Sequence, residues 1–167
     1  MHVYLNVNLD AFAYNCYDAD MANRKDHPSE AAVVAWARLL RVSQGLLSAV
    51  EADLKAAGLP PFDWYDVLLE LHRAGRGGLR PYELKDATLL AQYNLSRLAE
   101  RLLKAGYIER LPCPEDRRGH ILRITAEGRQ VRRKMWPVYR AAISEHFARR
   151  LDKDDVRRLT GILGKLA

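Results

Sequence analysis

Two adjacent arginines, Arg117 and Arg118, follow an acidic residue in the stretch LPCPEDRRGHILRIT, residues 111–125. Prolines, a glycine and charges are mixed here, which is typical of an exposed turn and not of a core. A guanidinium group offers several N–H donors and a fixed positive charge, and phosphate oxygens are its natural partners. A carboxylate has little reason to sit at a polyanion surface unless it braces a cation, and Asp116 is placed to do so. The stretch therefore predicts a phosphate or minor-groove contact with nucleic acid.

A second group of polar side chains lies upstream, in the stretch AQYNLSRLAERLLKAG. Its leucines recur at helical spacing, so the polar residues occupy the other face of a helix. Asn and Gln pair with the edge of adenine, and Arg pairs with guanine. The candidate contacts are Gln92, Tyr93, Asn94, Ser96, Arg97 and Arg101, together with His120 on the later stretch. Which of them reads a base stays open, and Arg101 is also suited to serve the fold.

The net charge of +6 is distributed unevenly along the 167 residues. Residues 1–79 carry 7 Lys/Arg and 10 Asp/Glu side chains, whereas residues 80–134 carry 13 and 7. Residues 135–167 carry 7 and 4. The middle of the chain is therefore the region expected to bind a polyanion. The alternative interpretation is a basic surface that only contacts solvent.

Length and composition narrow the class of protein. A chain of 167 residues with 49% hydrophobic and 29% charged side chains is a globular domain. Apolar runs fall short of the roughly 18 residues of a membrane span, and the N-terminus lacks the basic start of a signal peptide. Cys16 and Cys113 form no disulfide framework, which suits a reducing compartment. We therefore expect a cytoplasmic protein with no membrane partner.

Enzyme chemistry finds little support in the sequence. The five histidines are scattered, and no CxxC, HxxxH or GxSxG pattern or phosphate-cradling glycine loop is present. The sequence therefore predicts no catalytic residue, no metal site and no cofactor.

The elements that must position these residues are mainly helical. A long amphipathic helix is predicted from Ser29 to Gly58, followed by three short helices, the third of them ending at Gly106. The runs YIERLPC and HILRIT then read as two strands with PEDRRG at the tip, and Pro112 requires that this hairpin projects. A helix to about Leu151 follows, and a final helix is predicted to begin at Asp152 and to bury its apolar stripe.

The run LSRLAERLLKAGYIERLPCPEDRRGHILRITAEG resembles the MarR family of bacterial transcriptional regulators. In that family the recognition helix ends in an R-L-x-x-x-G pattern with two hydrophobic residues and an Arg, the wing carries D-x-R, and a hydrophobic-T-x-x-G pattern follows. The matching residues here are Arg101, Leu102, Gly106, Tyr107, Ile108, Arg110, Asp116, Arg118, Ile124, Thr125 and Gly128. The resemblance covers roughly residues 30–166.

This resemblance implies a mainly α winged helix-turn-helix fold with a two-stranded β-wing and long terminal dimerisation helices. Residues 61–124 would form the DNA-binding region, and residues 29–60 and 125–167 the dimerisation region. Residues 1–28 would be an extension that DNA binding does not need. The implied function is a ligand-responsive repressor that binds a palindromic operator in double-stranded DNA as a homodimer.

The resemblance also implies a small aromatic or phenolic effector between the dimer helices and the winged lobe. The candidate ligand residues are Trp36, Arg41, Trp64, Tyr65, Asp66 and His72, although the two tryptophans are better explained as core residues. Two further alternatives remain open. One is a thiol-based redox sensor. The positions of the cysteines argue against it, because Cys16 lies ahead of the first long helix and Cys113 lies on the wing, so neither is within that helix. The other is a winged-helix module that binds only proteins.

Overall fold

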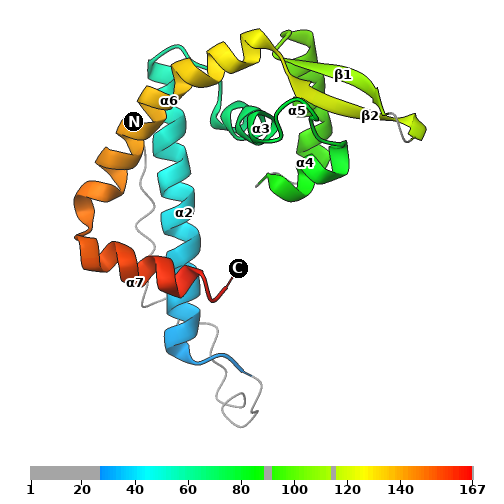
Figure 1. Ribbon diagram of the computed structural model, residues 1–167. Coiled ribbons are helices and arrows are strands. Elements are labelled where there is room, and N and C mark those ends of the chain that lie inside the picture. The colour runs from blue at the N-terminus through cyan, green and yellow to red at the C-terminus, as the bar shows by residue number, and fades with distance from the viewer. Residues whose placement is uncertain (1–26, 89–91, 114–115, 167) are drawn as a thin grey trace. The chain divides into compact units, whose positions relative to one another are not determined.

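The computed structural model describes residues 27–88, 92–113 and 116–166, with the side chains of 92–94 and 116–118 outside that description. The chain forms two compact units, residues 1–46 and residues 47–167. In order, the elements are α2 (Glu30–Ala56), α3 (Phe62–Arg73), α4 (Pro81–Ala87), α5 (Gln92–Lys104), β1 (Ile108–Cys113), β2 (Asp116–Ile124), α6 (Ala126–His146), η2 (Ala148–Arg150) and α7 (Lys153–Leu163) (Figure 1). The predicted fold class, helical with a two-stranded antiparallel sheet, is confirmed.

The start of α2 follows from its capping residue. The Ser29 hydroxyl accepts a hydrogen bond from the backbone N–H of Ala32 at 3.2 Å, as predicted for an N-cap. Several apolar side chains of the first unit are nevertheless exposed: Trp36, Leu39, Leu40 and Val42.

Within the described residues, α2 is long and apolar enough to cross a membrane by length and composition alone. The sequence expectation missed this because polar residues interrupt its apolar run, and a single helix of this kind is weak evidence for a span.

The winged lobe of the second unit has a continuous apolar core. It is built from the inward faces of α3, α4, α5 and the two strands, because each contributes leucine or isoleucine at the period of its own structure. The fully buried members include Val67, Leu68, Leu71, Leu84, Leu98, Leu102, Ile108, Leu122 and Ile124. This core fixes helix α5 against the strands that follow it.

A separate apolar cluster joins the end of α2 to α3 and α6. Its buried members are Val50, Leu54, Tyr65, Met135 and Ala142. Aromatic rings extend it, with Tyr65 and Tyr139 meeting edge to face at 5.1 Å. Burial raises the pKa of both tyrosine hydroxyls, Tyr65 and Tyr139. This second cluster connects the winged lobe to the terminal helices.

The two strands form an antiparallel ribbon that extends beyond α4 and α5 (Figure 1). Pro112 is exposed and lies opposite His120, and the register shifts between Pro112 and Cys113. The strand pairing continues past this bulge, so β2 begins at Asp116, four residues earlier than the sequence indicated. The backbone of Arg117 and Arg118 therefore belongs to a strand and not to the turn.

A compact junction ties the end of α5, the ribbon and α6 together. The Thr125 hydroxyl donates to the Gly106 carbonyl at 2.7 Å and accepts from the Gly128 N–H at 3.1 Å. The Thr125 N–H also donates to the Tyr107 carbonyl at 3.0 Å. A Cβ at Gly128 would lie 2.1 Å from the Tyr107 carbonyl oxygen, so any side chain there would collide with backbone. The predicted T-x-x-G pattern is thus a structural joint, which we call the Thr125 joint.

The C-terminal helices differ from the sequence expectation in two respects. Helix α6 ends at His146 and not near Leu151, because the turn η2 intervenes. Helix α7 starts as predicted, with the Asp152 carboxylate accepting from the N–H groups of Asp154 and Asp155. Its apolar stripe was expected to be buried, but Ile162 is 57% exposed and Leu166 is 72% exposed in the single chain. The apolar face of α7 is therefore left uncovered by the residues that the structure describes.

Candidate nucleic-acid interface

A concave surface of about 1600 Å³ lies between α4, α5 and the ribbon. Five Lys or Arg residues line it against three acidic residues. These charged residues are Arg80, Lys85, Arg97, Arg101 and Arg110, with Asp63, Asp86 and Glu100. The surface is thus positively charged and has a helix along it, as a surface that binds the backbone and groove of DNA requires.

Helix α5 presents its polar face to this surface. Leu95 and Leu98 are buried in the winged-lobe core, while Ser96 and Arg97 are exposed and line the concave surface. The helical period separates these two sets, as the sequence predicted. The first turn of α5 contains Gln92, Tyr93 and Asn94, whose side chains lie outside the described residues.

Two ion pairs hold α5 in place from either side. The Arg101 guanidinium lies 3.4 Å from an Asp63 carboxylate oxygen on α3. The Arg110 guanidinium on β1 donates to Glu100 of α5 at 2.6 Å. Exposed pairs of this kind contribute little to stability, but they fix the direction of the arginine side chains. Arg101 therefore both lines the concave surface and contacts α3, which leaves its two predicted roles compatible.

The turn before α4 is tied to the ribbon. The backbones of Leu79 and Leu122 exchange two hydrogen bonds, at 2.9 and 2.8 Å. Gly78 has a φ of +67°, and a Cβ there would lie 2.4 Å from the Leu122 carbonyl oxygen, so only glycine fits. Helix α4 then begins with Pro81, and the Glu83 carboxylate accepts from the Arg80 N–H at 2.7 Å. These contacts position α4 beside α5 as the first helix of a helix-turn-helix.

The wing residues are only partly described. The backbone of Asp116, Arg117 and Arg118 lies in β2, and their side chains lie outside the described residues. His120 is half-buried and lines the concave surface. Cys113 is buried at the bulge, with 5% of its surface exposed. In the described part of the chain, His, Cys, Asp and Glu side chains form no group that could hold a metal ion.

The candidate effector residues lie in several places. Trp36 and Arg41 belong to the first unit, 63% of Trp36 being exposed. Trp64 packs against the winged-lobe core, edge to face with Tyr107 at 5.6 Å. Tyr65 is buried in the second cluster, and His72 lines a different cavity at the base of the wing. Asp66 lies close enough to Tyr139 to help raise its pKa. The structure does not bring Trp64, Tyr65 and His72 into one pocket.

Some residues of the concave surface were missed by sequence reasoning. Arg80, Tyr82 and Lys85 reach it from α4, and Tyr82 is 58% exposed. A large exposed aromatic residue three positions from a lysine on a short helix was a usable signal. Asp63 could not have been found in this way, because it lies 38 residues from its partner Arg101.

Comparison with known proteins finds similarity to the MarR family in the middle of the chain. Residues 60–119 match the model of the MarR family. The multiple antibiotic resistance protein MarR of Salmonella typhimurium is 31% identical over 90 residues, which cover 54% of this chain and 62% of that protein. The matched part thus spans about three-fifths of this curated relative.

Two solved structures are also similar. A MarR family transcriptional regulator from Streptomyces coelicolor in complex with DNA superposes with a TM-score of 0.76 and 24% identity, covering 86% of this chain and 90% of that one. A cysteine-to-serine variant of MarR from Escherichia coli complexed with operator DNA superposes with a TM-score of 0.71 and 25% identity, covering 80% and 94%. These matches show that residues 60–119 have the sequence pattern of the MarR family and that the chain has the fold of its solved members.

Proposed function

We propose that this protein is a sequence-specific DNA-binding transcriptional regulator that acts as a homodimer in the cytoplasm. The observation that carries this proposal is the basic concave surface along α5, with Lys and Arg side chains from α4 and the residue before it, from α5 and from β1 around it. An exposed polar helix face beside a projecting ribbon suits a major groove with the adjacent backbone. The solved complex of the Escherichia coli MarR variant with operator DNA supports the same use of this fold.

The homodimer is supported by apolar surface that the single chain leaves exposed. On α7 and just after it this surface comprises Val156, Ile162, Leu163 and Leu166, and on α2 it includes Trp36, Leu39, Leu40 and Val42. Exposed apolar patches of this kind favour association. A two-fold dimer would present two α5 helices to half-sites about one turn apart, so the operator would be palindromic.

A response to a small molecule is a secondary part of this proposal. In a structural neighbour, BpsR from Bordetella bronchiseptica, DNA binding is regulated by 6-hydroxynicotinic acid. That likeness, at 21% identity, shows the fold alone. A thiol response at Cys113 has less support, because that thiol is buried and a redox sensor needs an accessible thiolate. Cys16, the other candidate, lies outside the described residues.

Substitution of the wing arginine, Arg118, and substitution of Arg97 on α5 should affect DNA binding differently. Arg118→Ala should weaken binding to operator and random DNA alike and reduce the log–log salt slope by about one, since a phosphate contact carries little base information. Arg97→Ala should cost about 1–3 kcal/mol on the operator and leave random DNA almost unchanged, if Arg97 reads a base. Fluorescence anisotropy at several salt concentrations measures both effects.

The matched control is Arg140→Ala, which removes one exposed arginine from α6, away from the concave surface. Asp116→Ala should resemble Arg118→Ala more weakly, because it removes the brace and keeps the cation. Equal salt slopes for Arg118→Ala, Arg140→Ala and wild type would mean that the wing arginine does not contact DNA. Wild-type protein that binds neither DNA would refute the proposed function itself.

A further inference from the structure

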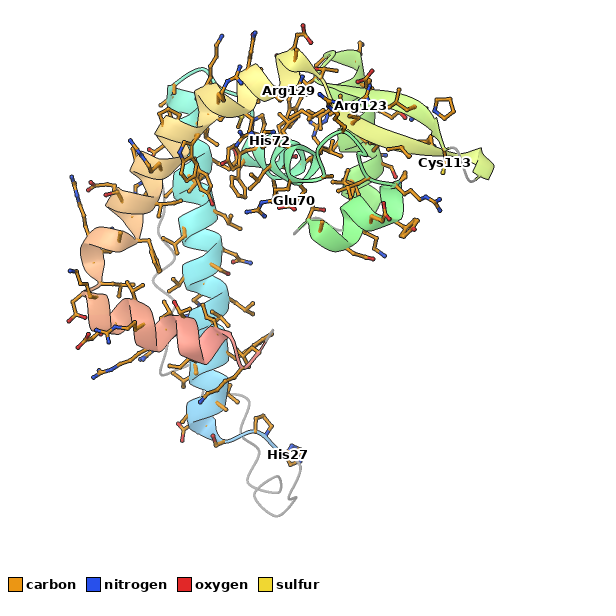
Figure 2. All side chains as sticks on the ribbon, in the orientation of Figure 1. His27, Glu70, His72, Cys113, Arg123 and Arg129 are labelled. Atoms are coloured by element: carbon orange, nitrogen blue, oxygen red, sulfur yellow. The ribbon has the colours of Figure 1, made fainter. Side chains whose placement is uncertain are left out.

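A second cavity, of about 600 Å³, lies at the base of the wing. Its charged lining comes from five places in the chain: His72 near the end of α3, Arg76 in the following turn, Glu109 on β1, Arg123 on β2 and Arg129 on α6. Figure 2 labels His72, Arg123 and Arg129 near the meeting of α3, β2 and α6. The cavity is therefore assembled by the tertiary fold and is not a feature of one helix.

The cavity has an excess of donors over acceptors. Arg123 donates to the Glu109 carboxylate through Nε at 2.9 Å and to the Arg76 carbonyl through Nη1 at 3.5 Å. Arg129 donates to the Ile124 carbonyl through Nη1 at 3.0 Å. A guanidinium group has five N–H donors, so these bonds leave further donors on both arginines. With Arg76 beside them, three guanidinium groups share the cavity with one carboxylate.

The charge around His72 points the same way. Although His72 is exposed, the loss of some of its hydration lowers its pKa below the usual value, and the guanidinium groups of Arg132, Arg129 and Arg133 lower it further. Each of these arginines disfavours a second positive charge on the imidazole. A negatively charged ligand is thus what this part of the surface would stabilise.

This cavity is distinct from the concave surface along α5. Ile108 and Leu122 of the ribbon are buried in the core that includes α5, and Arg110 on the same face bonds to Glu100 of α5. Successive residues of a strand point to opposite faces, and Glu109 pairs with Arg123 in register. Glu109 and Arg123 therefore lie on the face of the ribbon turned away from α5. DNA held along α5 would leave them uncovered.

We propose that this cavity, bounded by His72, Arg76, Arg123 and Arg129, binds a small organic anion with two or more carboxylate or phosphate groups. Its volume lies within the range of small-molecule sites. Guanidinium groups bind such oxygens through paired, charge-assisted hydrogen bonds, and several around one cavity favour a multiply charged anion. The proposal concerns the free protein and holds whether or not the chain binds DNA.

The test uses sulfate and citrate as probes, titrated into the full chain by isothermal calorimetry at low ionic strength. We expect saturable binding to the wild type and binding at least about tenfold weaker to the double variant Arg76→Gln/Arg129→Gln. The matched control Arg140→Gln removes an arginine of α6 that does not line the cavity and should bind as wild type does. Arg76→Gln alone, at an exposed turn, should weaken binding in the same direction if the double variant is unstable.

A second readout follows the His72 imidazole by NMR, with sulfate because its charge does not change during the pH titration. A bound anion favours the imidazolium form, so saturating sulfate should raise the pKa of His72 in the wild type and in Arg140→Gln. In the double variant, the pKa of His72 should be the same with and without sulfate. Unsaturable binding, or equal binding by all variants, would overturn the proposal. The proposal would also be overturned if the wild type bound no anion and the double variant lost DNA affinity, since Arg76 and Arg129 would then be DNA contacts.

Discussion

Gly128→Ala should lower the free energy of unfolding by about 2–4 kcal/mol, because its methyl group has no space. The added Cβ would lie 2.1 Å from the Tyr107 carbonyl oxygen and 3.0 Å from Ile124 Cγ1. Relief requires the backbone of Tyr107 to move, and that carbonyl accepts the Thr125 N–H. The substitution therefore strains the joint between the ribbon and α6. Denaturant unfolding at one fixed protein concentration measures the loss.

Gly161→Ala is the control for this substitution. Gly161 is also helical, but nothing lies within 4 Å of the Cβ it would gain. Alanine is favoured over glycine in a helix by about 1 kcal/mol, so this variant should be as stable as wild type or more so. Equal unfolding midpoints for the two alanine variants would show that the joint is not tightly packed.

Ile162→Asp should abolish the dimer at micromolar concentration. Ile162 is 57% exposed in the single chain and belongs to the apolar face of α7 that we propose a partner covers. A carboxylate buried there without a partner costs several kcal/mol, which is enough to raise the dissociation constant by about a hundredfold or more. Sedimentation measures the assembly, and circular dichroism checks that the helices remain.

Arg157→Gln is the matched control, because it makes the same change in net charge on the opposite face of α7 by helical spacing. It should remain a dimer. Operator affinity should fall in Ile162→Asp and not in Arg157→Gln, since a monomer presents one α5 helix where a dimer presents two. A wild-type chain that sediments as a stable monomer would contradict the homodimer itself.

Local features of the fold were readable from the sequence because they depend on neighbouring residues. Ser29 and Asp152 are followed by helices that their side chains cap, and both helices begin where these residues predicted. The onset of β2 was not readable, because its first residues pair across a bulge that no local pattern announces. The apolar stripe of α7 was identified correctly as a stripe, but periodicity alone does not say whether the covering surface lies in the same chain.

The candidate interface was predicted in part for the same reason. Arg97 and Ser96 could be placed by counting along a helix, and the structure has them exposed on the concave surface. The pairing of Arg101 with Asp63, and the cavity at the base of the wing, bring together residues far apart in the chain. No spacing rule predicts these, because tertiary packing decides them.

The Thr125 joint bears on how such proteins diversify. Its residues touch backbone carbonyls and one another, and none of them lines the concave surface along α5. The motif by which the chain resembles the MarR family is thus a structural joint of the fold. Exposed positions on the concave surface, such as Ser96 and Arg97, can therefore be substituted without disturbing that joint. A match to the motif therefore identifies the fold and does not identify the genes that the proposed regulator controls.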